Sequence, residues 1–414
     1  MIAEILSTGD EIRTGAVLDS NAAYLAATLE ECGIHVQRYQ GVGDDLNTIA
    51  ELLTEIGRRA EVAVVTGGLG PTQDDVTAEA AALAAGVSLS ERTEALDMIE
   101  AYFAKRGRPF TPANRKQALL PDTARILPNP IGTAPGFELS IETCRFYFLP
   151  GVPVEMEKMM IDHVVPGIRV LAGQTATAPV QTSRISTFGL PEAMVAEKLI
   201  GFKAQFKHVR LGLCTEFPEI VVKLYPDIRR SSESGPEIVD AAKWVSERLG
   251  KVVLSTRGES LPAVVGTMLR KQSARLAVAE SCTGGLLAHL LTGVAGSSDY
   301  FLFSAVTYAN QSKMDVLGVS AGTLQTCGAV HEATAREMAA GVRRLSGADY
   351  GLSTTGIAGP SGGTAEKPVG TVCIGLADRN GETARRFQLN FDNRSMNKRI
   401  FAFTALDQLR RALL

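Results

Sequence analysis

The sequence predicts an α/β fold that is divided among more than one domain. At both ends of the chain, short apolar runs alternate with stretches whose apolar residues recur at helical spacing. That alternation is typical of a largely parallel sheet covered by helices. The 414 residues also exceed what one hydrophobic core usually organises. We therefore expect two α/β domains with a smaller α+β module between them.

The first domain is expected to cover residues 1–170. Its strand candidates are "IAEIL", "EVAVVTGG" and "CRFYFLP", and its helix candidates are "NAAYLAATLEECG", "LNTIAELLTEIGRRA" and "DDVTAEAAALAAG". In a sheet of this kind, ligands bind at the loops that follow the strands.

The connector is expected over residues 175–255, and the second α/β domain over 260–414. In the connector, the order is a strand, "RISTFG", a helix, "LPEAMVAEKLI", two strands, "VRLGLCT" and "EIVVKLYP", a helix, "GPEIVDAAKWVSERLG", and a strand, "KVVLS". The last domain has the strand candidates "RLAVAES", "YFLFSAVTYAN", "YGLSTTG", "GTVCIGLAD" and "ARRFQLNF", between the helices "LPAVVGTMLRKQ" and "NKRIFAFTALDQLRRALL".

The composition favours small soluble ligands. The formal net charge of −3 gives no broad attraction to nucleic acid or to an anionic membrane. The six cysteines form no CxxC pair and are too sparse for a disulfide scaffold, so we expect reduced thiols. Because the first residues do not have the pattern of a signal peptide and no run of about 18 apolar residues occurs, we expect a cytoplasmic protein.

Two segments of the first domain combine glycine with carboxylates: "STGDEIRTGAVLDSN" (7–21) and "TGGLGPTQDDVT" (66–77). Gly67, Gly68 and Gly70 follow an apolar strand and precede a helix. Their backbone amides are unhindered by side chains and can face an anion. We expect a phosphate group to bind there.

Asp74 and Asp75, at the end of the second segment, allow two interpretations. They can form a charged turn at the start of the helix, where the helix dipole favours negative charge. Alternatively, with Asp10 or Glu11 across the cleft, they can hold a hard divalent cation that bridges phosphate oxygens. The combination of acids and glycines on two strand ends favours the cation.

The pattern "GDEI…G…DSN" followed by "TGGLGPTQDDVT" resembles the molybdopterin-binding domain family, and specifically the N-terminal domain of the CinA family of competence/damage-inducible proteins. The resemblance implies a three-layer α/β fold and a metal-dependent ADP-ribose pyrophosphatase activity. The residues that it places around the diphosphate and metal are Gly67, Gly68, Gly70, Asp74, Asp75 and Thr77, with Asp10, Glu11 and Asn21 on the facing loop.

In the last domain, "AESCTGG" (279–285) is predicted to be a strand-to-helix turn. A helix starting near Thr283 would point the amides of residues 282–285 outward, where they can hold an oxyanion or a phosphate. Ser281 is then either a nucleophile or, like Thr283, a helix N-cap. Cys282 is expected to point another way and to be buried.

A serine nucleophile needs a base, and "TYANQSK" (307–313) offers one. Tyr308 and Lys313 are expected at the end of a strand and in the turn beyond it. A lysine whose pKa is lowered by burial can deprotonate a serine, whereas a lysine in a turn is normally only solvated.

A third segment, "TTGIAGPSGGTAEKPVGTV" (354–372), is a long glycine-rich loop. It either binds phosphate through its amides or is a flexible connector. Arg394, Lys398 and Arg399 supply positive charge before the last helix.

Together, "AESCTGG", "Y-x4-K" and "TGIAGPSGG" resemble the C-terminal domain of the CinA family, the nicotinamide mononucleotide (NMN) deamidases. The resemblance implies hydrolysis of the NMN carboxamide to nicotinate mononucleotide and ammonia, with no cofactor. It implies Ser281 as nucleophile, Lys313 as general base, Tyr308 as its assistant, and Thr355 with nearby amides as stabiliser of the tetrahedral intermediate. The implied substrate-binding residues are Glu280, Thr283, Gly284, Gly285, Gly356 and Gly359, with a phosphate-binding arginine that is either Arg394 or Arg399.

One departure from the family pattern is visible: "GAVHEATA" has His331 where the family usually has serine. The connector resembles a KH-like module but has no "GxxG" loop between its helices, so we expect no nucleic-acid partner. The resemblance further implies a homodimer that acts on NMN and ADP-ribose, away from membranes.

Two alternatives to a two-activity enzyme stay open. In one, only the deamidase is active and the N-terminal domain is a regulatory nucleotide-binding module. In the other, the protein is a non-catalytic interaction protein of competence or DNA repair. The presence of Ser281, Tyr308 and Lys313 argues against the latter.

Overall fold

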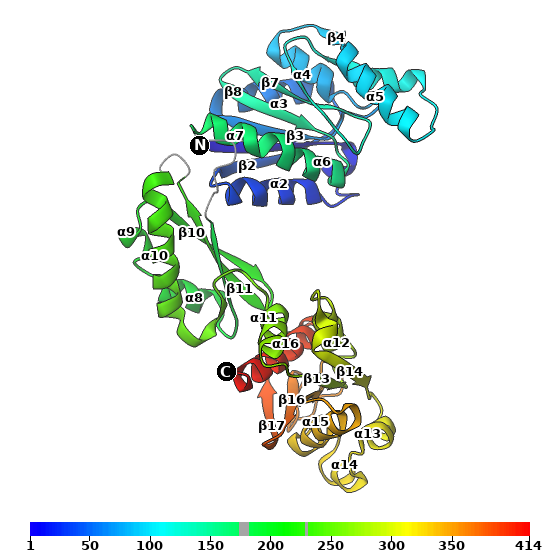
Figure 1. Cartoon of the computed structure of the whole chain (residues 1–414), viewed down its shortest axis with the longest axis vertical. Coiled ribbons are helices and arrows are strands. Elements are labelled where there is room, and N and C mark those ends of the chain that lie inside the picture. Colours follow the sequence, from blue (N-terminus) through cyan, green and yellow to red (C-terminus); the bar gives the residue numbers. More distant parts are fainter. Residues whose placement is uncertain (174–181, 228–230) are drawn as a thin grey trace. The chain divides into compact units, whose positions relative to one another are not determined.

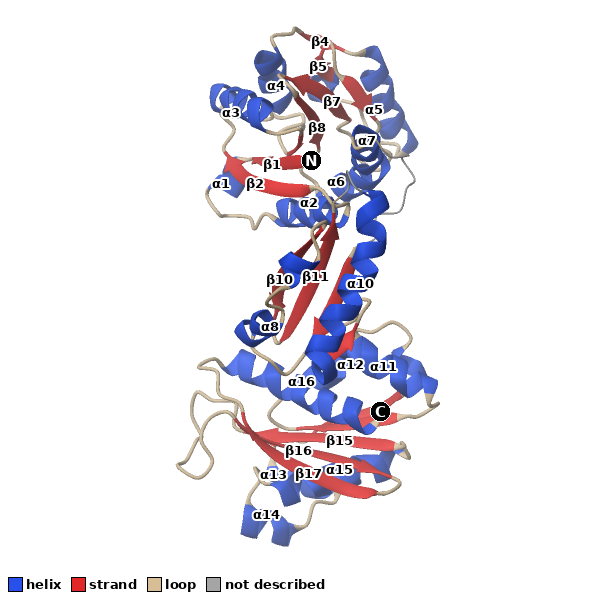
Figure 2. Cartoon of the chain, turned by 90° about the vertical axis from the view of Figure 1, so that its left-hand side faces the viewer, coloured by secondary structure: helices blue, strands red, loops and turns tan. Residues whose placement is uncertain are grey.

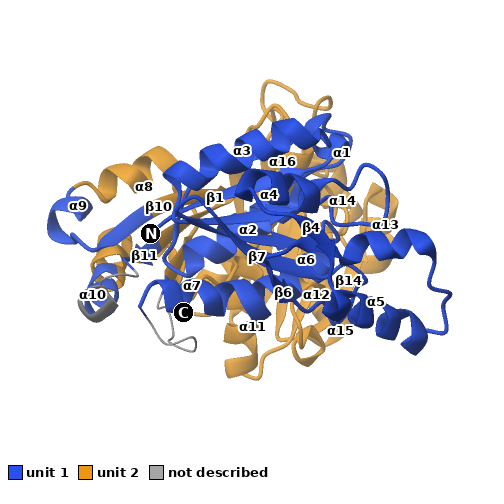
Figure 3. Cartoon of the chain, turned by 90° about the horizontal axis from the view of Figure 1, so that it is seen from above, with its two compact units in different colours: residues 1–182, 201–211, 224–241 blue, residues 183–200, 212–223, 242–414 orange. Residues whose placement is uncertain are grey.

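The computed structural model describes residues 1–173, 182–227 and 231–414. The chain forms two compact units, one of residues 1–182, 201–211 and 224–241 and the other of residues 183–200, 212–223 and 242–414 (Figure 3). Each unit contains a sheet with apolar cores on both faces, so the predicted α/β fold class is confirmed. The predicted start of the connector, residue 175, lies outside the described residues.

The first unit is built on a sheet that includes β2, β3, β7 and β8 (Figure 1). The sheet has six strands in the order β2-β1-β3-β8-β7-β6. Neighbours from β2 to β8 run parallel, whereas β7 and β6 run antiparallel to their neighbours. The strands are β1 (Ile2–Thr8), β2 (His35–Val42), β3 (Val62–Thr66), β6 (Arg125–Leu127), β7 (Gly136–Ile141) and β8 (Cys144–Leu149), and a separate pair joins β4 (Leu89–Glu91) to β5 (Leu119–Pro121).

Helices pack on both faces of this sheet. They are α1 (Asp10–Arg13), α2 (Ser20–Glu31), α3 (Leu46–Arg59), α4 (Thr77–Ala85), α5 (Thr93–Lys105), α6 (Pro153–Met159) and α7 (Val165–Leu171), with a 3-10 helix (Pro112–Ala118) and a π turn (Met160–Val164). One core joins Leu25 of α2 and Met156 of α6 to the sheet, and the other joins Leu53 of α3 and Ala80 of α4 to it. Because β3 lies between these cores, all of its residues are buried.

The connector segment contains a four-stranded sheet with the order β10-β11-β9-β12. Its strands are β9 (Ser183–Thr187), β10 (Val209–Glu216), β11 (Glu219–Pro226) and β12 (Val253–Ser255), and its helices are α8 (Glu192–Lys198), α9 (Phe202–Gln205), α10 (Ser231–Leu249) and a 3-10 turn (Gly250–Val252). All four predicted strands and both predicted helices are therefore observed.

The second unit contains a five-stranded sheet with the order β14-β13-β15-β16-β17. The strands are β13 (Leu276–Glu280), β14 (Phe301–Val306), β15 (Tyr350–Gly356), β16 (Thr371–Asp378) and β17 (Gly381–Gln388). The helices are α11 (Leu261–Lys271), α12 (Leu286–Thr292), α13 (Asn310–Leu317), α14 (Ala321–Cys327), α15 (Glu332–Ser346) and α16 (Arg394–Ala412), with a 3-10 turn (Ser297–Asp299). Helices α11, α12 and α16 cover one face and α15 the other (Figure 2). None of the helices in the described parts of the chain is long and apolar enough to cross a bilayer.

Candidate functional site

The C-terminal candidate site forms where β13 ends between two parallel neighbours. Glu280 of β13 is paired with Val306 of β14 on one side and with Thr354 of β15 on the other. The carboxyl ends of the three strands therefore meet at one edge, which is where open α/β sheets bind ligands. This register brings "AESCTGG", "TYANQSK" and the start of "TTGIAG" together.

Ser281 and Lys313 lie side by side at this edge. Lys313 Nζ is 3.1 Å from Ser281 Oγ, within hydrogen-bond distance. The amide of Ser281 donates to the carbonyl of Thr354 at 2.9 Å, which fixes the first residue of the turn to the neighbouring strand. The structure thus joins the two residues that the sequence offered as nucleophile and base.

Lys313 is fully buried, and its hydrogen-bond partners in the described residues are uncharged oxygens. Lys313 belongs to helix α13, rather than to a turn as expected, and its side chain is 0% exposed. Besides Ser281 Oγ, its Nζ contacts the carbonyls of Thr307 and Tyr308 at 2.8 and 3.0 Å. Burial lowers the pKa of Lys313 below its usual 10.5. A buried amine of lowered pKa is suited to accept a proton from a serine.

Cys282 is directed into the apolar core of the unit, as the sequence predicted. It packs in the cluster that contains Leu287 and Phe401 and is 5% exposed. Burial raises the pKa of its thiol to about 12. Since the thiolate is the reactive form of cysteine, Cys282 is a packing residue and Ser281 is the nucleophile candidate.

Glu280 fixes the shape of the "AESCTGG" turn from beneath. Its carboxylate is 0% exposed and accepts hydrogen bonds from Thr283 Oγ1 at 2.7 Å and from the amide of Gly285 at 3.0 Å. It also accepts from the amides of Leu287 and Ala288 at 3.0 and 2.9 Å. The carboxylate and the hydroxyl of Thr283 are therefore directed toward the protein's own groups.

This arrangement changes the expected start of the helix. Helix α12 begins at Leu286 and not near Thr283, and neither Ser281 nor Thr283 serves as its N-cap. In the described chain, the amides of Cys282 and Thr283 donate to no protein oxygen, whereas that of Gly285 is taken by Glu280. Because Thr283 is 0% exposed, the amide of Cys282 is the candidate donor for an oxyanion.

Arg394 and Tyr308 contact each other through their side chains. Arg394 Nη2 donates to Tyr308 Oη at 3.1 Å and Nη1 to the carbonyl of Gly359 at 2.6 Å. The Tyr308 side chain is 61% exposed, and only the backbone carbonyl of Tyr308 touches Lys313. Arg394 therefore links the strand end of β14 to the glycine-rich loop.

The two candidate arginines are directed to different places. Arg399 Nε donates to the carbonyl of Phe217 in the connector at 2.7 Å, away from Tyr308 and Gly359. Lys398, which the sequence noted only as a nearby charge, is placed beside the turn, since a Cβ built on Gly284 would lie 3.4 Å from Lys398 Nζ. Arg394 and Lys398 are thus the candidate cations near the sheet edge at which Ser281 lies.

Thr355 and the glycines of the third segment are packed tightly. Thr355 is 1% exposed, and its hydroxyl donates to the carbonyl of Ala329 at 2.8 Å. A Cβ on Gly356 would lie 2.5 Å from the carbonyl of Thr371, so that position accepts only glycine. Gly359 has a φ of 81°, which glycine adopts readily.

His331, which stands where the family usually has serine, is the N-cap residue of helix α15. Its Nδ1 accepts a hydrogen bond from the amide of Ala333 at 3.1 Å and caps helix α15. A serine at this position could form the same cap, because both side chains present an acceptor to the second amide of the helix.

The N-terminal candidate site is a pocket of about 420 Å³ at the ends of β1, β3 and β8. The predicted residues that line it are Glu11, Asn21, Gly67, Gly68, Gly70, Asp74 and Asp75, and Asp19, Asp44 and Glu155 add further carboxylates. The side chain of Asn21 donates to Thr66 Oγ1 and to the carbonyl of Gly151 at 3.2 and 2.8 Å, while its own Oδ1 is buried without a protein partner in the described chain. This buried acceptor therefore belongs to a residue of the pocket wall.

The glycines of this pocket allow backbone segments to approach closely. A Cβ on Gly67 would lie 2.3 Å from the carbonyl of Thr8, and one on Gly68 would lie 2.1 Å from Thr77 Oγ1. Thr77 is buried and bonds to Thr8 Oγ1 at 3.0 Å, so it joins the two loops and does not line the pocket. The amide of Gly67 donates to Leu149, which leaves the amides farther along the loop for an anion.

The acids of the pocket repel one another. Burial is the main cause that raises the pKa of Asp44, and the negative charges of Glu11, Asp10 and Asp74 add to that rise. Asp44 was missed because it follows a strand whose polar sequence gives no strand signal, although "GVGDD" repeats the combination of glycine and acid. A cation or an additional proton would relieve this repulsion.

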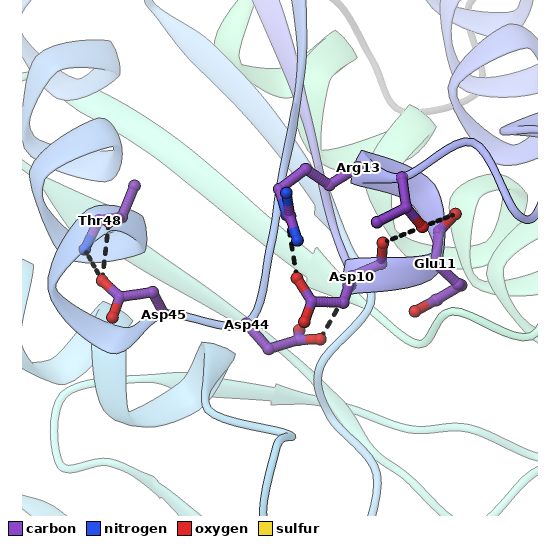
Figure 4. Close-up of polar contacts among 7 residues, drawn as sticks. Asp10, Glu11, Arg13, Asp44, Asp45 and Thr48 are labelled. Atoms are coloured by element: carbon purple, nitrogen blue, oxygen red, sulfur yellow. Dashed lines mark hydrogen bonds and ion pairs between the residues drawn. The ribbon is translucent and has the colours of Figure 1, made fainter.

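Asp10 and Asp75 have partners of their own. Asp10 forms an ion pair with Arg13 at 3.0 Å, and its amide donates to Asp44 at 2.9 Å (Figure 4). Asp75 Oδ2 accepts from the amide of Thr72 at 2.8 Å and stiffens the turn before α4. Across the described ranges, no three His, Cys, Asp or Glu side chains converge to hold a metal by themselves. Magnesium in nucleotide sites is commonly held by one or two carboxylates with substrate phosphates, so the residues present fit that mode.

Comparisons with known proteins cover both candidate sites. Residues 258–413 match the CinA C-terminal domain, and residues 4–170 match a probable molybdopterin binding domain. A CinA-like protein of Desulfosudis oleivorans is 52% identical over 100% of both chains. A CinA-like protein of Geobacter metallireducens is 44% identical, also over 100% of both chains.

Two solved structures are similar to parts of the chain. The competence/damage inducible protein CihA from Agrobacterium tumefaciens is 42% identical, with a TM-score of 0.36, over 37% of this chain and 93% of that chain. The molybdopterin biosynthesis enzyme MoaB from Thermus thermophilus is 16% identical, with a TM-score of 0.29, over 42% of this chain and 99% of that chain.

Proposed function

Since this chain belongs to the CinA family, we propose that its C-terminal domain is an amidase that hydrolyses the carboxamide of NMN to nicotinate mononucleotide and ammonia. The observation that carries the proposal is the 3.1 Å distance between Lys313 Nζ and Ser281 Oγ, with the lysine fully buried. A serine hydroxyl beside a buried lysine amine is the arrangement of Ser-Lys hydrolases.

The proposed reaction starts with attack of Ser281 Oγ on the carboxamide carbon while neutral Lys313 takes the hydroxyl proton. The amide of Cys282, the residue after the nucleophile, stabilises the tetrahedral oxyanion, as the corresponding amide does in other serine hydrolases. Lys313 then returns the proton to the departing nitrogen, which leaves as ammonia. A water molecule, deprotonated by the same lysine, attacks the acyl-serine; the bond to Ser281 Oγ breaks, Lys313 returns the proton to that oxygen, and the carboxylate is released.

The substrate phosphate is proposed to lie near Arg394 and Lys398. Arg394 offers a planar pair of donors that suits phosphate oxygens, and in the structure those donors are held by Tyr308 Oη and Gly359. Arg399 is a weaker candidate because its Nε is bonded to the connector. We propose that the Tyr308 hydroxyl orients Arg394. This replaces the expectation that the hydroxyl assists Lys313, which is bonded to the backbone carbonyl of Tyr308.

Incubation of the purified full chain with NMN tests this proposal. Ammonia and nicotinate mononucleotide should appear in equal amounts. Arg394→Ala should raise KM for NMN more than it lowers kcat, because it removes binding that the ground and transition states share. Absence of ammonia release by a folded protein would exclude the amidase.

We further propose that the N-terminal pocket cleaves ADP-ribose to AMP and ribose phosphate with a divalent cation. The pocket's glycine loop and its acids support this proposal. Asp44 and Asp74, together with the phosphate oxygens of the substrate, would hold the cation, which would supply charge neutralisation at the diphosphate. The alternative is that the pocket is a regulatory nucleotide-binding site. Binding of ADP-ribose without cleavage would favour this alternative.

Cleavage of ADP-ribose should require added Mg²⁺ or Mn²⁺ and should stop with EDTA. Asp44→Asn and Asp75→Ala are both expected to lower the rate, the first through loss of a ligand and the second through loss of the Thr72 turn. Glu142→Gln, which removes an acid outside the pocket, is the matched control. Turnover that survives EDTA would contradict the role of the cation.

A further inference from the structure

The tip of the β10–β11 hairpin contacts the segment that leads into α16. The carbonyl of Phe217 accepts a hydrogen bond from Arg399 Nε at 2.7 Å. The ring of Phe217 packs edge-on against that of Phe391, with centroids 5.0 Å apart and planes at 80°. Two residues after Phe217, Glu219 Oε1 accepts a hydrogen bond from the amide of Leu261 at 2.8 Å. Three contacts of different kinds therefore fix the hairpin tip.

Phe391 is in turn held by one buried asparagine. Its amide donates to Asn397 Oδ1 at 2.8 Å, and its carbonyl accepts from Asn397 Nδ2 at 2.8 Å. Asn397 is 0% exposed and also donates to the carbonyl of Ala358 at 3.0 Å. This asparagine joins the Phe391 segment to the glycine-rich loop.

Arg394 lies between the two segments that Asn397 joins. Its Nη1 donates to Gly359, the neighbour of Ala358, at 2.6 Å. The residue before it, Asn393, caps α16 by accepting from the amides of Ser395 and Met396 at 2.9 and 3.1 Å. The position of the guanidinium therefore depends on the Phe391 segment, and that segment rests on the hairpin tip.

We propose that Phe217 is a positioning residue for Arg394, so that the connector sets the affinity of the C-terminal site for the phosphate group of its substrate. Phe217 acts through the Phe391 ring and touches no reacting atom. The nature of the substrate rests on the proposed amidase function, whereas the ordering of the Arg394 segment does not. An edge-on aromatic pair contributes a factor of about 2 to 10 to an equilibrium, which sets the size of the expected effect.

Kinetics of the full chain carrying Phe217→Ala test the proposal. KM for NMN should rise about 2- to 10-fold with kcat within twofold of wild type. Nicotinamide riboside, which lacks the phosphate, should show the same kcat/KM in both proteins. In an Arg394→Ala background, Phe217→Ala should cause no further rise in KM for NMN, because the group that it positions is absent.

Two variants separate positioning from general damage. Phe217→Tyr keeps the ring and should restore KM to the wild-type value. Thr215 lies on the same hairpin, and its hydroxyl donates to Glu192 of α8. Thr215→Ala removes this bond, which does not involve Phe391, and should leave the kinetic constants for both substrates unchanged. An unchanged KM for NMN in Phe217→Ala, or an equal loss with nicotinamide riboside, would overturn the proposal.

Hydrogen exchange provides a readout that does not depend on turnover. The amides of Phe391, Ser395 and Met396 should exchange faster in Phe217→Ala than in wild type and Thr215→Ala. If wild type releases no ammonia from NMN, the amidase fails and exchange alone decides the inference. Equal protection of this segment in wild type and Phe217→Ala would refute the positioning role in either case.

Discussion

The carboxylate of Glu280 accepts a hydrogen bond from the amide of Gly285 at 3.0 Å and closes the turn that carries Ser281. The same side chain satisfies the amides of Leu287 and Ala288, where an N-cap residue would act in an ordinary helix. The nucleophile candidate is thereby released from a capping role.

Replacement of Glu280 by alanine should destabilise the protein and abolish amidase activity. It leaves three amides and the Thr283 hydroxyl without their acceptor in a buried turn, at a cost of about 2–5 kcal/mol. Urea unfolding measures this loss. Glu280→Gln keeps one acceptor oxygen and should lie between the two proteins. An unaltered unfolding midpoint for Glu280→Ala would show that the turn does not depend on the carboxylate.

Ser281→Ala and Cys282→Ala should have opposite effects on ammonia release. The serine variant should lose activity by a factor of about 1000 or more, because no other hydroxyl contacts Lys313 Nζ in the described residues. The cysteine variant should keep most of its activity and lose about 1 kcal/mol of stability from the small cavity. The reverse order of activities would assign the nucleophile to the thiol.

The activity should rise with pH as Lys313 loses its proton. Burial lowers the pKa of Lys313 from 10.5, so the midpoint of the kcat/KM profile should lie below that value. Lys313→Arg keeps a positive charge at every accessible pH and should be inactive throughout. A profile that stays flat where the lysine titrates would contradict its role as the base.

Glu219 should make the stability of the protein fall as pH rises. Burial raises its pKa from 4.5 to about 7, so the folded protein holds a proton there that the unfolded chain has lost. The stabilisation is complete below pH 4.5 and disappears as pH passes 7, a change of about 2–4 kcal/mol. Glu219→Gln keeps an acceptor for Leu261 and should remove this dependence, measured as the difference in urea midpoints between variant and wild type. A constant difference from pH 4 to 8 would show that Glu219 titrates normally.

The strands that follow apolar runs were predictable from the sequence, since burial on both faces leaves a continuous hydrophobic signal. This held for β3, "VAVVT", and for β13, "LAVAE". Strand β2, "HVQRYQGV", was not predicted because it lies at the sheet edge with mostly exposed polar side chains. Asp44, which follows it, was missed with it.

The candidate site was predictable in its residue types but not in its contacts. The motifs placed Ser281 and Lys313 at strand ends, and the parallel pairing of β13 with β14 accounts for their meeting. The inward direction of Glu280 and the separation of Arg394 from Arg399 depend on contacts between segments far apart in the chain. Local sequence carries no record of such contacts.

The complete burial of Lys313 places a desolvated amine beside the nucleophile candidate, at a cost in free energy of folding. A methionine would fill the same space without desolvating an amine, but it would leave the carbonyls of Thr307 and Tyr308 without this donor. Because the two effects oppose each other, Lys313→Met should give an inert protein with a stability close to that of the wild type. Such a protein would be a convenient form in which to capture the intact substrate in a crystal.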